Sequence, residues 1–190
     1  MLRSSLSVDR YILEEFSEQA KNNGKTLYAF ANEWLSTSLK ISSEGGSAQE
    51  MMKLWRIFSV LKQVEAIILP SDFIESLILK LYGIDKAGLL SMFSRLGEDL
   101  VGIMKMVAPN IKELSGLAGT FSAVLPTKKI DINVDKDAVV VSIIGAGRKM
   151  ETTECSFEFV KSILNGYGYR ITYNELHVGT IMVRCEPKNY

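Results

Sequence analysis

The feature that most constrains the fold of this chain is a change in the spacing of its apolar residues at Pro126. Before it, over residues 48–124, apolar residues recur at the three- and four-residue intervals of helices. After it, Ile130, Ile132 and Val134 alternate with polar residues, which is the pattern of a half-buried strand. The chain therefore combines a helical region with a separate β-containing region.

The part after Pro126 predicts a β-β-α-β-β order, because each segment has its own period and its own turn. We expect strands at 130–134 and 138–144, a helix at about 154–165, and strands at about 169–175 and 179–186. Together with the helices before it, this order predicts an α+β fold with an antiparallel sheet.

The N-terminal segment predicts a short β-α-α arrangement. Residues 2–8 alternate as a strand, Asp9 caps a helix through about Asn22, and Thr26 caps a second helix over 27–40. The Gly- and Ser-rich stretch at residues 42–47 is a linker by composition.

We therefore predict three parts: a ribbon-helix-helix-like segment at 1–41, the linker at 42–47, and a helical plus α/β ligand-binding-like domain at 48–190.

The composition limits the cellular compartment and the kinds of partner that we expect for this chain. The 22 basic residues balance the 22 acidic ones, which argues against a highly basic nucleic-acid coat. No stretch has the length and apolarity of a signal peptide or a spanning helix, so we expect a cytoplasmic protein with no membrane association. The two cysteines, Cys155 and Cys185, are too few for a disulfide scaffold and are expected to be reduced thiols.

The first 40 residues are too few to bury an adequate core alone, so we expect them to pair with a second copy as a homodimer. Their residues resemble the ribbon-helix-helix family of DNA-binding proteins: Leu6-Ser7-Val8-Asp9, the helix with Leu13 and Phe16, and the turn from Ala20 to Thr26. The resemblance implies that the paired strands enter the major groove of DNA. By position, Arg3, Ser5 and Ser7 would then face the bases, while backbone amides near Lys25 and Thr26 would bind a phosphate.

The rest of the chain resembles the four-vinyl-reductase (hydrocarbon-binding) domain, which shares its fold with transport-particle subunits and, more distantly, heme nitric-oxide-binding domains. The matching residues lie at 68–73, 93–100, 154–157 and 169–173, with Gly179 before the last strand. The resemblance implies an apolar pocket for a small hydrophobic ligand. Its expected lining is Leu100, Met104, Phe121 and Phe157.

Some members of that group carry a cysteine pair around the glycine near the last strand, associated with metal. Here residues 174–178, just before Gly179, contain no cysteine, and Met182 stands about where the second would be, so we expect no metal site and no cofactor.

Catalytic signatures are weak in this sequence. His177 is the single histidine, which excludes a two-histidine relay, and Cys155 has acidic neighbours that raise a thiol pKa. No Walker loop or nucleophile elbow is present, so the sequence does not favour an enzyme.

The hypothesis that combines these observations is a homodimeric, DNA-binding transcriptional regulator with a sensing domain for a small apolar ligand. The alternative is a homodimeric protein that binds a hydrophobic ligand or serves as a scaffold and does not bind DNA.

Overall fold

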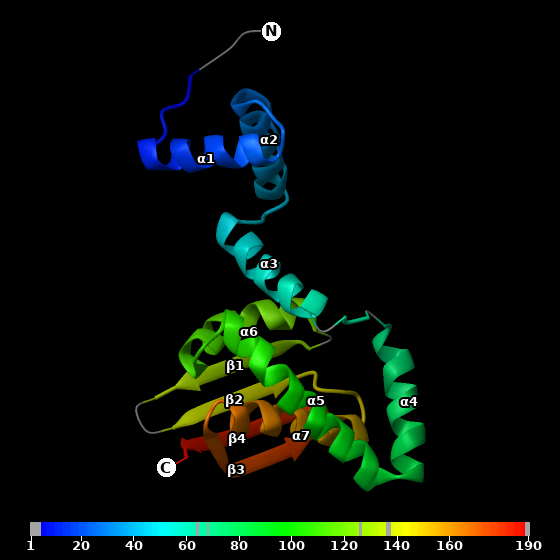
Figure 1. The fold of residues 1–190 in the computed structure, drawn as a ribbon. Helices are drawn as coiled ribbons and strands as arrows, with labels where there is room; N and C mark the ends of the chain where they lie inside the picture. Colours follow the sequence, from blue (N-terminus) through cyan, green and yellow to red (C-terminus); the bar gives the residue numbers. More distant parts are fainter. Residues whose placement is uncertain (1–4, 64, 68, 126, 136–137, 189–190) are drawn as a thin grey trace. The chain divides into compact units, whose positions relative to one another are not determined.

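The computed structural model describes residues 5–63, 65–67, 69–125, 127–135 and 138–188. Within them the chain forms seven helices and one four-stranded antiparallel sheet (Figure 1). The predicted α+β class is therefore confirmed.

The chain divides into two compact units, an N-terminal unit of residues 1–51 and a C-terminal unit of residues 52–190. The N-terminal unit contains α1 (Arg10–Asn22) and α2 (Leu27–Ser43). The helix α3 (Ala48–Gln63) crosses the boundary between the units.

Helix α1 has its predicted bounds, although the Asp9 side chain makes no capping hydrogen bond. Helix α2 begins where predicted but ends at Ser43, three residues beyond the predicted end at residue 40 and inside the predicted linker. Gly24 has a φ of +66°, which lets the chain leave α1 in a left-handed conformation that favours glycine. The side-chain oxygen of Thr26 then accepts a hydrogen bond from the backbone N–H of Ala29 at 3.2 Å and so caps α2.

The predicted N-terminal strand was wrong over its described part. Residues 5–9 have no strand structure, and the rest of the predicted strand, residues 2–4, lies outside the described residues. A strand needs a hydrogen-bonding partner on at least one edge, and the sheet of the C-terminal unit does not include this segment.

The C-terminal unit contains four further helices, and local caps set the beginning of two of them. Asp85 accepts from the N–H of Gly88 at 2.8 Å, and Asn110 accepts from the N–H of Glu113 at 3.0 Å. The helices are α4 (Ser71–Ile84), α5 (Lys86–Val107), α6 (Ile111–Val124) and α7 (Met150–Gly166). No helix in the described part of the chain is long and apolar enough to cross a bilayer.

The sheet confirms the predicted β-β-α-β-β order. Its strands are β1 (Lys129–Val134), β2 (Val139–Ile144), β3 (Tyr169–His177) and β4 (Thr180–Pro187). Their spatial order is β1-β2-β4-β3, so β2 and β4 form the centre and are joined in sequence through α7 and β3.

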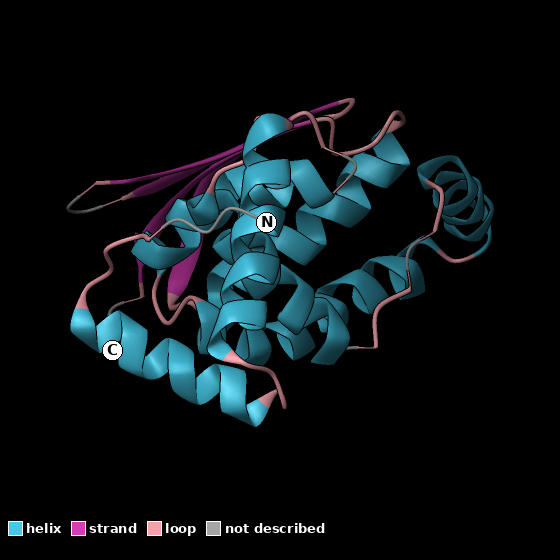
Figure 2. Ribbon diagram, turned by 90° about the horizontal axis from the view of Figure 1, so that it is seen from above, coloured by secondary structure: helices cyan, strands magenta, loops and turns pink. Residues whose placement is uncertain are grey.

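The core lies between one face of this sheet and the helices. Figures 1 and 2 show α5, α6 and α7 on the same side of the strands. The inward side chains of the two central strands are almost fully buried, because they alternate with outward ones at the period of two that a strand imposes. They are Val139, Val141, Ile143, Ile181, Val183 and Cys185.

Helix α7 begins four residues earlier than the predicted start at residue 154. A carboxylate from another helix makes this possible: Oε1 of Glu75, on α4, accepts from the backbone N–H of Arg148 at 2.7 Å. Arg148 also pairs with Asp72 at 2.5 Å. A negative group therefore lies at the positive end of the α7 dipole, where it stabilises the first turn.

Candidate functional site

The residues expected to read DNA bases lie before α1. In the single chain, Ser5 and Ser7 are exposed and have no secondary structure, and Arg3 lies outside the described residues. Their expected role was tied to pairing with a second copy and stays a prediction.

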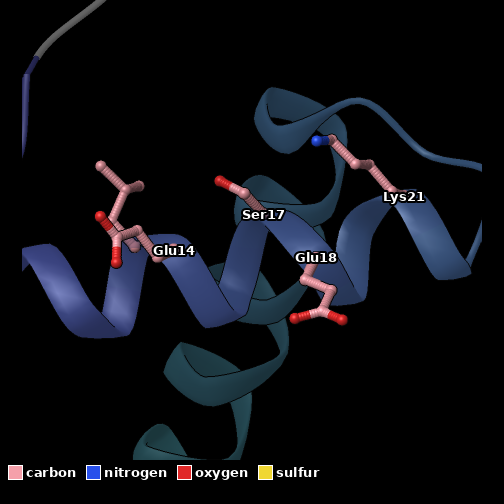
Figure 3. Close-up of a pocket in the computed structure, with 5 residues that line it drawn as sticks. Glu14, Ser17, Glu18 and Lys21 are labelled. Atoms are coloured by element: carbon pink, nitrogen blue, oxygen red, sulfur yellow. The ribbon is translucent and has the colours of Figure 1, made fainter.

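One of the backbone amides expected to bind phosphate already has a partner within the chain. The N–H of Lys25 donates to the carbonyl oxygen of Ala20 at 2.9 Å, and its side chain forms an ion pair with Glu33. The hydroxyl of Thr26 caps α2. Beside them, α1 presents a shallow hollow whose labelled side chains all project from that one helix: Glu14, Ser17, Glu18 and Lys21 (Figure 3). Its carboxylates repel a phosphate backbone, which opposes binding that depends on phosphate contacts.

The residues expected to line an apolar pocket are brought together, but they pack as core. Leu100 and Met104 on α5, Phe121 on α6 and Phe157 on α7 are all partly buried against the same core cluster of the C-terminal unit. Neither of the two principal hollows on the described surface is lined by any of them. These side chains therefore fill the space between helices and sheet.

The N-terminal unit has a very small core. Among its described residues the only buried apolar side chains are Ala20 and Phe30. The ring of Phe30 lies 4.8 Å from that of Phe16 and 6.0 Å from that of Trp34, centroid to centroid. One aromatic cluster and one alanine are too little burial to stabilise two helices.

Most large apolar side chains of this unit are instead exposed, by between 37% and 71%. We call them the N-terminal apolar set: Leu6, Val8, Tyr11, Ile12, Leu13, Leu27, Tyr28, Trp34, Leu35 and Leu39. Helix periodicity alone predicted several of these residues as apolar stripes, but their exposure could be learned only from the structure. They are the strongest candidate functional surface of the chain, since isolated proteins rarely expose so much apolar area.

The ionisable groups with displaced pKa values act as structural contacts. The carboxylate of Glu154 binds Lys86 at 2.7 Å and also accepts from the hydroxyl of Tyr82. These two hydrogen bonds lower the pKa of Glu154, while burial is the main cause that raises the pKa of Tyr82. The group joins α4 and α5 to α7, and it lies outside both principal hollows.

The cysteines and the histidine show no arrangement for catalysis or metal binding. Cys155 and Cys185 are free and buried, and burial raises the pKa of each thiol to about 11. His177 is exposed and lies 2.7 Å from a carboxylate oxygen of Glu175, whose pKa it lowers. Within the described ranges, no three His, Cys, Asp or Glu side chains gather where they could hold a metal ion.

Comparison with known proteins returns neither the ribbon-helix-helix family nor the four-vinyl-reductase domain. No protein-family model and no curated protein matches the chain. The solved structures that match are H-NOX domains. An oxygen-binding H-NOX domain related to soluble guanylate cyclases is 12% identical over 74% of this chain and 92% of its own, with a TM-score of 0.44. A variant of the H-NOX domain of T. tengcongensis is 12% identical over 69% and 86%, with a TM-score of 0.43.

These matches correct the two family resemblances. The matching structures are neither ribbon-helix-helix proteins nor four-vinyl-reductase domains, so both resemblances were wrong. The predicted function, a DNA-binding regulator with an apolar-ligand sensor, was wrong with them. At these identities and TM-scores the H-NOX likeness itself does not assign the chain to a family.

Among the described residues, His177, Tyr167 and the two cysteines are not placed to hold a heme, the group named in two of the matching structures. Heme iron is held by His, Cys, Tyr or a Met–His pair facing an apolar pocket. The side chain of His177 is 69% exposed on a hairpin and pairs with Glu175. Tyr167 donates to a backbone carbonyl at 2.7 Å, and Cys155 and Cys185 are buried as thiols. None of these groups lines either principal hollow of the described surface.

Proposed function

We propose that this chain acts as a self-associating protein, a homodimer whose N-terminal unit is the dimerisation element. The observation that carries the proposal is the contrast within that unit between two buried apolar residues, Ala20 and Phe30, and the exposed N-terminal apolar set. Association with a second copy supplies the core that two helices lack.

The exposed area supports such an interface. An aromatic side chain buries roughly 150–250 Å² when fully enclosed, and the set contains three of them, Tyr11, Tyr28 and Trp34, each more than half exposed. These three alone offer on the order of 350 Å². The seven aliphatic members add to this area, toward the roughly 800 Å² that each partner contributes to a standard interface.

The charge of the unit supports a second copy as the partner. Acidic and basic side chains both occur in the unit, with Arg10 paired to Glu14 at 2.9 Å and Lys25 paired to Glu33. A surface that carries both positive and negative charges can contact a second copy of itself without net repulsion. A partner with a strong charge of one sign gains little electrostatic attraction from such a surface.

The test is the mass of the full chain in solution, measured by light scattering after size exclusion over a range of concentrations. Leu35→Glu places a charge in the set at a side chain that is 49% exposed, so it leaves the small core of the unit intact. Ser38→Glu adds the same charge to an exposed polar position of the same helix and is the matched control.

We expect the unchanged chain to have at least twice the mass of one copy, L35E to lower that mass by a factor of two or more, and S38E to leave it unchanged. Circular dichroism must show equal helix content in all three. If the unchanged chain is monomeric at every concentration, or if L35E and S38E behave alike, the proposal fails.

A further inference from the structure

A second apolar surface lies in the C-terminal unit, where α4 turns into α5. Ile84 is 74% exposed, Met92 is 64% exposed and Leu96 is 49% exposed. Ile84 and Met92 line a hollow between the two helices; the other lining residues are Leu81, Asp85, Gly88, Leu89, Ser91 and Arg95. We call this surface the α4–α5 corner.

The residues of the α4–α5 corner suit a contact between two copies of this same surface. Gly88, Met92 and Leu96 follow each other at i, i+4 spacing on α5, and Ile84 is the last residue of α4. The Asp85 carboxylate covers Gly88, since a Cβ at that glycine would collide with one of its oxygens. In an antiparallel pair of α5 helices, Met92 of each copy lies over Gly88 and the Asp85 side chain of the other.

The charges of the corner fit the same arrangement. Asp85 and Arg95 have opposite signs and lie ten residues apart, so two antiparallel copies place each Asp85 beside the Arg95 of the other copy. One oxygen of Asp85 accepts from Gly88 at 2.8 Å, which leaves its second oxygen open to a partner. Arg95 takes part in no ion pair with any residue that the structure describes. Of the neighbouring basic groups, Lys86 is already paired with Glu154.

We propose that the α4–α5 corner is a two-fold contact between copies of this chain, with the first halves of the two α5 helices antiparallel. The occupant is a second copy because the charges at the two ends of the corner differ in sign. When a second copy is turned by 180° onto such a surface, each charge meets one of opposite sign. A partner of uniform charge would be attracted at one end and repelled at the other. This contact goes beyond the proposed N-terminal dimer, since it uses a different unit.

Cysteine cross-linking on the full chain tests the arrangement directly. Ser91 is exposed and lies close to the midpoint between Asp85 and Arg95, where the two-fold axis would pass, so Ser91→Cys should form a disulfide with its own copy under mild oxidation. Ser76→Cys, at an exposed position on α4 outside the corner, is the matched control. The native thiols add little background, because both are buried.

Charge variants test the pairing within that contact. In the S91C chain, Arg95→Glu should lower the rate of cross-linking at least tenfold, because the new carboxylate faces Asp85. Adding Asp85→Asn should recover part of that rate, since Asn keeps the helix cap and removes the repulsion.

The proposal is overturned if S91C cross-links no faster than S76C, or if R95E leaves the rate of S91C unchanged. Repeating the measurement with L35E separates the two interfaces. Cross-linking of S91C that persists with L35E supports the corner whether or not the N-terminal unit dimerises. Cross-linking of S91C that disappears with L35E shows that the corner does not associate by itself, and the proposal then fails.

Discussion

The contact between α5 and α7 makes a sharp prediction about Gly97. This residue is buried on α5 where that helix packs against α7. A Cβ built on it lies 2.6 Å from the backbone carbonyl oxygen of Phe159 and 2.8 Å from Cβ of Ser162. The same contact holds the hydroxyls of Ser94 and Ser162 at 2.8 Å. The substitution Gly97→Ala must therefore push the two helices apart.

Two opposing terms set the magnitude of this change. Alanine stabilises a helix by about 1 kcal/mol relative to glycine. Overpacking in a closed contact costs about 1–3 kcal/mol, and the upper end applies here because the obstructing atoms belong to backbone and Cβ, which have no rotamer to change. We expect G97A to lower the free energy of unfolding by about 1–2 kcal/mol in balance.

The control is Gly102→Ala on the same helix. Gly102 is exposed and a Cβ there meets nothing within 4 Å, so only the propensity gain of about 1 kcal/mol remains. Urea unfolding of the full chain at one protein concentration, followed by circular dichroism, measures both variants against the unchanged chain. The reasoning about helix contact is refuted if G97A is as stable as G102A.

Other contacts make predictions of their own. Thr153 is fully buried and its hydroxyl accepts from the N–H of Gly179 at 2.9 Å, so Thr153→Val should lower the free energy of unfolding by about 1–3 kcal/mol, more than Thr153→Ser does in the same urea titration. The thiols of Cys155 and Cys185 have pKa values raised from 9.0 to about 11 in the folded chain, so the folded form binds more protons than the unfolded form between those values. Stability should therefore fall as pH rises from 9 to 11, and replacing both cysteines with alanine should flatten that part of the stability profile; an unchanged slope would contradict the assigned burial. Glu154 has a lowered pKa, so its contribution should be present at neutral pH and disappear as pH falls through its folded value. Glu154→Gln should remove that acid-side loss in melting curves, and a variant that keeps it would show that other carboxylates are responsible.

Elements that depend on neighbouring residues were predictable from the sequence. Thr26 caps the helix that follows it, as its position before an apolar run indicated. The alternation of Ile130, Ile132 and Val134 correctly placed β1, because one face of that strand packs on the core.

Features that depend on distant residues were not predictable in this way. The early start of α7 relies on Glu75, which reaches the N–H of Arg148 from 73 residues away. For the predicted pocket, the apolar character of Leu100 and Phe157 indicated only that these side chains become buried on folding. Whether such residues enclose a cavity or fill it depends on the approach of α5 to α7, which Gly97 controls. In the N-terminal unit, the same apolar stripes were compatible with a core or with an interface, and burial decides between them.

The central position of β4 has a consequence for how the protein is made. Its hydrogen bonds to β2 join Val139 to Cys185 and Ile144 to Thr180, so the two middle strands of the sheet are far apart in the sequence. During synthesis β1 and β2 emerge first as a lone hairpin, which is marginal in water by itself. The four-stranded sheet is complete only after β4 has left the ribosome. Until then the apolar faces of α5, α6 and α7 lack the full sheet on which they pack. Apolar surface exposed in this way makes incomplete chains prone to aggregate through those faces.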